Sequence, residues 1–237
     1  MARCTKEEAL ETRTRILDAA EDVFHAHGVG RTSLADVAHA ANVSRGAIYW
    51  HFKNKSDLFD AMCERVRLPM EAMVEATADE RENDPLGRLR KTCVFVLQDT
   101  AQNPHSRKVL DILFHKCEFV DAADPISIRQ QECFLQGEAD IERILRNAIA
   151  KGQLPHDLDT RLAGITFHAT IHGLLNNWLF SPVRFDLASD AEKLVDACLD
   201  TLRSARSLRT IRSTPSDDAI TPVMSRGSGL AMPGRAR

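Results

Sequence analysis

Apolar residues recur at intervals of three and four positions through nearly the whole chain. In the first segment Ile16, Ala20, Val23 and Phe24 follow this spacing, which predicts an amphipathic helix over residues 9–27. No sustained alternation of apolar and polar residues, the sign of a half-buried strand, interrupts the pattern. The hydrophobic pattern therefore predicts an all-α fold.

A short loop and two further helix starts follow this segment. Gly28 is placed to end the first helix, and Ser33 can cap the next one with Asp36 completing a capping box. Asn42 tolerates the left-handed backbone that a sharp turn between helices requires, and Ser44 can cap the third helix. Two short helices joined by so tight a turn predict a helix-turn-helix.

The third helix, residues 45–52, carries its own anchoring signal. Ile48 and Phe52 lie one turn apart and are expected to face inward, with Val43 placed as a hydrophobic staple. Lys53 and Asn54 break this helix, and Asn54 is expected to cap a longer one. The remaining faces of the third helix are left for another contact.

Beyond this region the pattern predicts a larger helical body. Further helices are expected over residues 86–101, 106–120, 126–150, 160–180 and 188–207. After Leu208 the composition changes to Ser, Pro, Gly and Arg with little periodicity, which indicates a disordered tail. We divide the chain into a helix-turn-helix domain (1–55), a helical domain (56–208) and a tail (209–237).

Charge and composition narrow the function. The net charge of -3 argues against coating nucleic acid by bulk charge, yet residues 42–56 hold Arg45, Lys53 and Lys55 and no acid. No apolar run reaches the length of a membrane span and the start is too charged for a signal peptide, so we expect a cytoplasmic protein with no membrane partner. Six scattered cysteines without a CxxC pair predict reduced thiols.

The exposed part of the third helix suits double-stranded DNA. Arginine pairs with guanine in the major groove, small residues allow close approach to bases, and Tyr and His can hydrogen-bond phosphate oxygens. The predicted DNA-contacting residues are Ser33, Ser44, Arg45, Gly46, Ala47, Tyr49, Trp50, His51 and Lys55. The sequence leaves open whether Trp50 packs on the first helix or faces DNA.

The segment RTSLADVAHAANVSRGAIYWHFKNKSDLF resembles the N-terminal DNA-binding domain of the TetR family of bacterial repressors. ARCTKEEALETRTRILDAA, DPL, ILFHKCEFV and NWLF resemble its AcrR-type branch, whose members repress multidrug efflux operons. The resemblance covers roughly residues 1–209 and departs at Asn42, where the family usually has glycine. It implies that six of the predicted residues contact DNA: Ser33, Arg45, Gly46, Tyr49, His51 and Lys55.

The resemblance also implies a homodimer formed by the last two predicted helices. On the final helix the apolar stripe comprises Leu194, Val195, Cys198, Leu199 and Leu202. It is wider than a lone surface helix needs. We assign the stripe to the dimer contact, with the core of the single chain as the alternative.

A cavity for a drug-like, hydrophobic inducer is the third implication of the resemblance. Helical faces that mix apolar groups with isolated polar ones supply the candidates: Cys93, Val96, Leu110, Phe114, Ile141, His168, Ile171 and His172. Plain core is the alternative for each of them. An unpaired histidine is costly to bury, which favours His168 and His172 as polar contacts.

No cofactor, metal site or enzymatic motif is expected. His168 and His172 do have metal-ligand spacing, but nothing places a third ligand beside them. We therefore predict a ligand-responsive repressor that leaves its operator when the inducer binds. A metal- or thiol-responsive regulator on the same scaffold is the alternative, and a helical enzyme or adaptor is the third possibility.

Overall fold

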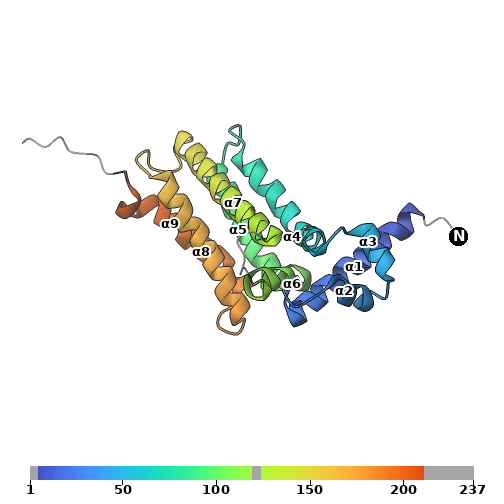
Figure 1. Cartoon of the computed structure of the whole chain (residues 1–237). Coiled ribbons are helices and arrows are strands. Elements are labelled where there is room, and N and C mark those ends of the chain that lie inside the picture. The colour runs from blue at the N-terminus through green and yellow to red at the C-terminus, as the bar shows by residue number, and fades with distance from the viewer. Residues whose placement is uncertain (1–4, 119–123, 211–237) are drawn as a thin grey trace, which may run out of the picture.

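The computed structural model describes residues 5–118 and 124–210, and these are almost entirely helical. Helices α1 to α3 form a head at one end, and the remaining helices form an elongated body (Figure 1). Within the described ranges the one β-feature is an isolated bridge between Leu158 and Arg209. The predicted all-α fold is confirmed.

The head is built from three helices with capped ends: α1 (Lys6–His27), α2 (Leu34–Ala40) and α3 (Arg45–His51). A capping box at Thr5 starts α1 earlier than predicted. Gly28 ends α1 with φ 81°, Ser33 and Asp36 form the expected capping box, and Asn42 turns the chain with φ 53°. The helix-turn-helix prediction is thereby confirmed.

The long helix α4 (Lys55–Ala78) leads from the head into the body. Phe24 of α1 and Phe59 of α4 meet edge to face at a centroid distance of 6.1 Å in the middle of the head's core. Val109 and Ile112 of the body belong to the same hydrophobic cluster. The head therefore packs directly against the body and shares a hydrophobic core with it.

A second hydrophobic cluster fills the body. It is formed by α5 (Pro85–Gln102), α7 (Pro125–Ala150), α8 (Thr160–Phe180) and α9 (Leu187–Ser204). Helix α9 lies mainly against α5, and four residues of its apolar stripe are buried there: Val195, Cys198, Leu199 and Leu202. The assignment of Val195 and Leu199 to a dimer contact was wrong, because both are buried within the chain, whereas Cys198 and Leu202 are buried but also line the groove between α8 and α9. Leu194 alone of the stripe stays partly exposed.

Two predicted helices end differently from expectation. The helix predicted over 106–120 consists of α6 (Pro104–Asp111) followed by a π-helical turn, η1 (Ile112–Lys116), and an extended Cys117. The last helix stops at Ser204 and is followed by a short 3-10 turn, η2 (Arg206–Leu208). The Thr210 N–H donates to the carbonyl oxygen of Asp157, so the ordered body reaches two residues into the predicted tail. The rest of that tail lies outside the described residues.

Candidate nucleic-acid interface and ligand pocket

Helix α3 is held to the head by one side only. The Ser44 side chain accepts a hydrogen bond from the Ala47 N–H at 3.1 Å, which caps the helix. Ile48 and Phe52 are buried, with 0% and 2% of their surface exposed, as predicted. Tyr49 and Trp50 are 54% and 73% exposed, so Trp50 is not part of the core. The side of α3 opposite its anchor is therefore a free aromatic surface.

The polar groups around this surface are mostly cationic or neutral. Arg45, Gly46 and Lys53 are exposed, and Ala47 is half-buried. Burial and the nearby Arg13 guanidinium lower the pKa of His51, which favours its neutral form at pH 7. Such a surface can approach a phosphate backbone, and the Asp57 carboxylate at its edge already accepts a hydrogen bond from the Lys53 backbone N–H at 2.9 Å.

Arg13 was not identified from the sequence. Its guanidinium lies over the Phe52 ring, 5.2 Å from the ring centroid, at the edge of the surface made by α3. The sequence shows Arg13 only as one of several charged residues near the start of the first helix. The position of Arg13 beside α3 depends on how α1 packs against α3, and helical periodicity does not predict that packing.

Lys55 and Ser33, like Ser44, are predicted DNA contacts that already have partners within the chain. The Lys55 ammonium group donates to the carbonyl oxygens of Val29 and Gly30, at 2.8 and 3.2 Å, and ties the loop after α1 to the start of α4. The Ser33 hydroxyl donates to Asp36 at 2.7 Å. Both residues shape the head, and their contact with DNA stays a prediction.

All eight predicted ligand-binding residues lie in the body, and their role in ligand binding stays a prediction. Cys93 and Ile171 are buried in its core, and four others pack against that core: Val96, Leu110, Phe114 and Ile141. His168 and His172 follow on α8 beside the aromatic rings of Phe114 and Phe134. The contributing segments are α5, α6, η1, α7 and α8.

The two histidines form a ring cluster with two phenylalanines. Ring centroids lie 4.2 Å apart for His168–His172, 5.6 Å for Phe114–His172 and 4.7 Å for Phe134–His168. Burial lowers the pKa of His172 to about 4, with His168 adding to the effect, and burial also lowers the pKa of His168. Nδ1 of His168 is buried without a hydrogen-bond partner, with the Glu138 carboxylate 3.8 Å away. At neutral pH the cluster is uncharged, apolar on its faces and able to form a hydrogen bond.

Phe134 of this cluster was also missed. It lies on α7, and the sequence offered only a single aromatic residue within a polar helix. Its position opposite His168 results from the packing of α7 on α8.

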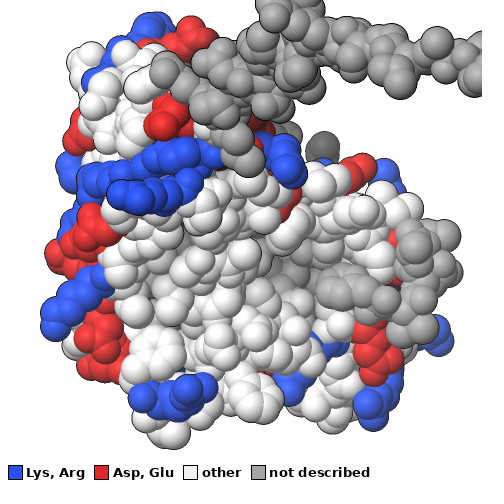
Figure 2. Space-filling view, turned by 90° about the vertical axis from the view of Figure 1, so that its left-hand side faces the viewer, with Lys and Arg blue, Asp and Glu red and all other residues white. Residues whose placement is uncertain are grey.

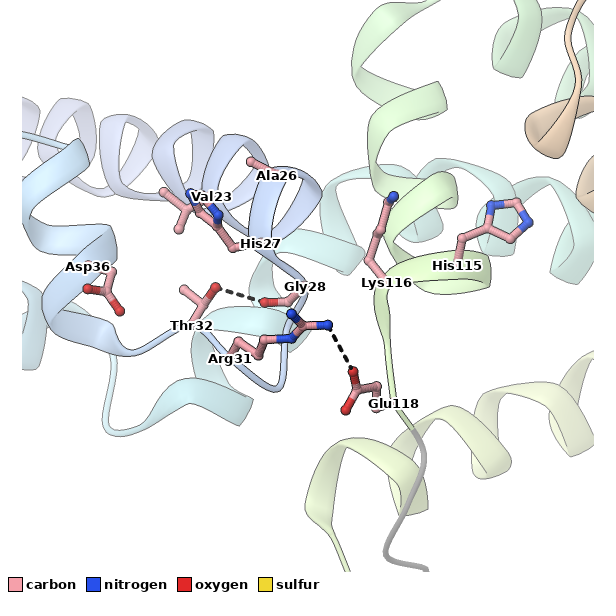
Figure 3. A pocket seen from close by; sticks show the side chains of 10 residues that line it. All are labelled: Val23, Ala26, His27, Gly28, Arg31, Thr32, Asp36, His115, Lys116 and Glu118. Carbon is pink, nitrogen blue, oxygen red and sulfur yellow. Dashed lines mark hydrogen bonds and ion pairs between the residues drawn. The ribbon is translucent and has the colours of Figure 1, made fainter.

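Two hollows formed by the described residues were not indicated by the sequence. A cleft of about 640 Å³ lies between the head and the η1 turn, and its polar lining includes His27, Arg31, Lys116 and Glu118 (Figure 3). A groove of about 230 Å³ runs between α8 and α9. None of the eight predicted ligand-binding residues lines either hollow.

Within the ranges 5–118 and 124–210, no group of three or more His, Cys, Asp and Glu side chains is placed to hold a metal ion. No helix in those ranges is both long and apolar enough to cross a membrane.

The head and the body each match a known protein family. Residues 16–62 match the model of bacterial regulatory proteins of the tetR family, and residues 84–204 match the C-terminal region of MAATS-type transcriptional repressors. The chain is 43% identical to the HTH-type transcriptional regulator TtgR of Pseudomonas putida over 88% of this chain and 100% of that protein. The chain belongs to the TetR family.

Two solved structures of TetR-type regulators show the same architecture. NalD, the secondary repressor of the MexAB-OprM multidrug efflux pump in Pseudomonas aeruginosa, has a TM-score of 0.74 and 36% identity over 84% of this chain and 99% of its own. A complex of SmeT with triclosan has a TM-score of 0.74 and 33% identity over 86% of this chain and 96% of its own. These findings confirm the predicted family and its function as a transcriptional regulator.

Proposed function

We propose that this TetR-family protein is a homodimeric repressor of a multidrug efflux operon, released from its operator by a hydrophobic, drug-like inducer. The observation that carries the proposal is the division of α3 into a buried anchor and an exposed Tyr49–Trp50 surface. A recognition helix needs both, since it must be rigidly held yet open to the major groove. The relatives' efflux targets extend the proposal from DNA binding to the regulated genes.

In this proposal residues 1–55 read the operator and residues 56–208 bind the inducer and dimerise. We assign base contact to Arg45 and backbone contact to Tyr49 and His51, with Trp50 covering the groove edge. The remaining predicted contacts are Ser33, Ser44, Gly46, Ala47 and Lys55. An operator-binding regulator acts where the chromosome is, so we place it in the cytoplasm.

The outer face of α8 and α9 is the dimer surface in this proposal. Arg161 is the single Lys, Arg, Asp or Glu residue in α8, and Leu162 and Ile165 are 37% and 39% exposed. Figure 2, which views the α8–α9 end of the molecule, shows a broad uncharged area below a row of Lys and Arg side chains. A second copy would cover this area and the groove between α8 and α9.

The inducer site in this proposal is the region around the ring cluster of Phe114, Phe134, His168 and His172. Two neutral imidazoles beside aromatic faces favour a ligand that is largely apolar and carries a hydrogen-bonding group. Triclosan, which is bound in the SmeT complex, is of this kind and serves as a first probe.

The test is specific binding to the intergenic DNA that flanks the gene, measured by fluorescence anisotropy with and without triclosan. We expect nanomolar binding at moderate salt, well above binding to unrelated DNA, and release on adding the probe. Arg45→Ala should weaken specific binding, whereas Arg81→Ala, which removes the same charge from the exposed segment between α4 and α5, should not. Absence of specific binding by the wild type would overturn the proposal. Binding without release by triclosan or any of a panel of apolar drugs would restrict it to a constitutive repressor.

A further inference from the structure

Head and body meet along a polar seam, which we define as the contact of α1 with α6. Three side-chain pairs cross it: Glu21–His105, Asp22–Lys108 and His25–Asp111. The outer two pairs are solvent-exposed on the α1 side, with 69% of the Asp22 side chain and 45% of the His25 side chain accessible. Only 4% of the Glu21 side chain is accessible. The Glu21–His105 pair is therefore buried on the α1 side, whereas the other two pairs are exposed there.

Glu21 joins three helices at one carboxylate. One oxygen lies 2.6 Å from His105 Nδ1 of α6, and the other accepts from the Arg65 guanidinium of α4 at 3.1 Å. The same guanidinium also binds Asp18, one turn earlier on α1, at 2.7 Å. The carboxylate thus lies where the head, the connecting helix and the body meet.

Removing the Glu21 carboxylate from water costs free energy, and its charged partners offset only part of this cost. Burial raises the pKa of Glu21 to about 7, against the opposing effect of Arg65. Asp18 and Asp22 of α1 raise it further, and Lys108 of α6 lowers it. Burial and Arg65 likewise lower the pKa of His105, which Asp99 of α5 partly offsets. Near neutral pH the seam therefore holds a carboxyl group that changes its charge.

A cleft lies beside the seam, between the η1 turn and the end of α1 with its following loop, and its volume is about 640 Å³ (Figure 3). The loop and the turn are joined by a hydrogen bond from the Val29 N–H to the Lys116 carbonyl oxygen at 3.0 Å. The Arg31–Glu118 pair also spans the cleft, at 3.9 Å between two exposed side chains, which is a weak connection. Compared with that pair, the buried contact at Glu21 is the firmer restraint on the head.

We propose that Glu21 is a positioning residue for operator binding: it fixes the pose of the head on the body, and its protonation sets how firmly the head is held. The inference rests on the proposed repressor function, because a dimer binds its operator only when both heads keep the spacing of the two half-sites, roughly 34–36 Å or a multiple. When the seam is closed, the two heads keep that spacing before DNA binds. When the seam is loose, the spacing has to form during binding, and operator affinity is lower.

The direction of the pH effect follows from linkage. In the closed seam the pKa of Glu21 is raised above the ordinary carboxyl value of 4.5, to about 7, and opening the seam would return it toward 4.5. Protons therefore favour the closed seam. The stabilisation is complete below the ordinary pKa and is lost as the pH rises through about 7. Ionisation of Glu21 at alkaline pH therefore lowers the affinity of the protein for its operator.

The test compares Glu21→Gln with Glu11→Gln, the same neutral substitution at a buried and at an exposed position of α1. Operator affinity of the full chain is measured from about pH 6 to about pH 8 at constant ionic strength. Histidines near the DNA titrate in all three proteins and cancel when each variant is divided by the wild type. We expect Glu21→Gln to bind like the wild type near pH 6 and at least about threefold more tightly near pH 8. The Glu11→Gln ratio should stay constant.

The remaining outcomes separate the possibilities. A ratio for Glu21→Gln that does not change with pH overturns the inference, as does weaker binding of this variant throughout the range. Should Glu21→Gln fail to fold, Glu21→Leu removes the titrating group with an apolar side chain, and its affinity relative to the wild type must rise in the same way from about pH 6 to about pH 8. Wild-type protein that binds no operator at any pH overturns the repressor proposal itself. A constant ratio with intact binding overturns only the role of Glu21.

Discussion

Ile48 and Trp50 lie two positions apart on α3 and therefore point to nearly opposite sides of the helix. Replacing Ile48, which is 0% exposed, with Ala removes three buried carbons. At about 0.8 kcal/mol per carbon plus a cavity contribution, we expect a loss of about 3 kcal/mol in the free energy of unfolding. Trp50 is 73% exposed and buries only about 70 Å². Trp50→Ala should therefore cost at most about 1.7 kcal/mol.

The effects on operator affinity should be distributed differently. Tryptophan is enriched among the interface residues whose truncation weakens binding by more than about 1 kcal/mol, so Trp50→Ala should bind the operator at least about fivefold more weakly while remaining folded. Urea unfolding followed by circular dichroism, at one protein concentration, gives the stabilities, and anisotropy of labelled operator gives the affinities. Ile48→Val is the graded control and should lose about 1 kcal/mol. An unchanged unfolding midpoint for Ile48→Ala would show that the core does not anchor α3. Wild-type affinity of Trp50→Ala would remove that residue from the interface.

Four further outcomes are expected. Arg45→Ala should lose about 1–3 kcal/mol of operator affinity and relax specificity at one base position; equal weakening on all sequences, measured by competition, would reassign Arg45 to a phosphate. Lys55→Met should lower the melting temperature, because two carbonyl oxygens lose their donor. If Lys55 also contacts a phosphate, the salt slope of DNA binding should fall by about one, and an unchanged slope would leave it a purely structural role. Asn42→Gly should be neutral or stabilising and Asn42→Ala should cost about 1 kcal/mol in thermal unfolding, since φ is 53° there; equal stability of the two would contradict this. The pKa of His172 is lowered from its ordinary value of 6.5 to about 4 in the folded protein. Neutral His172 therefore contributes stability above pH 6.5, and this contribution is lost as the pH falls toward 4. Wild type should thus lose on the order of 2 kcal/mol more than His172→Phe over this range in urea unfolding, and parallel curves would show that His172 is not buried.

Local signals predicted the head almost completely. The capping residues Ser33, Ser44 and Asn54, and the turn residue Asn42, act through their own backbone neighbours, so their positions follow from the sequence. The inward side of α3 was also predictable, because helical spacing fixes which residues share a face. The exposure of Trp50 was not, since it depends on whether another helix reaches that face.

The body shows the limit of such signals. The stripe on α9 was correctly recognised as apolar, but two of its residues, Val195 and Leu199, belong to the core of the single chain, because a stripe gives no information about which helix covers it. The buried Glu21 was missed for the same reason. In the sequence it is one acidic residue on a charged helix, and its burial arises only when α4 and α6 close over it.

The sequence by itself determined where the helices lie, how the head turns, which side of α3 is anchored, and membership in the TetR family. These properties depend on residues within a few positions of one another or on a contiguous motif. Tertiary structure alone decided the partner of α9, the ring cluster of Phe134 with His168, and the carboxylate enclosed at the seam between head and body. Each of these brings together residues from different helices, and their burial and pKa values depend on the packing of those helices, which helical periodicity does not encode.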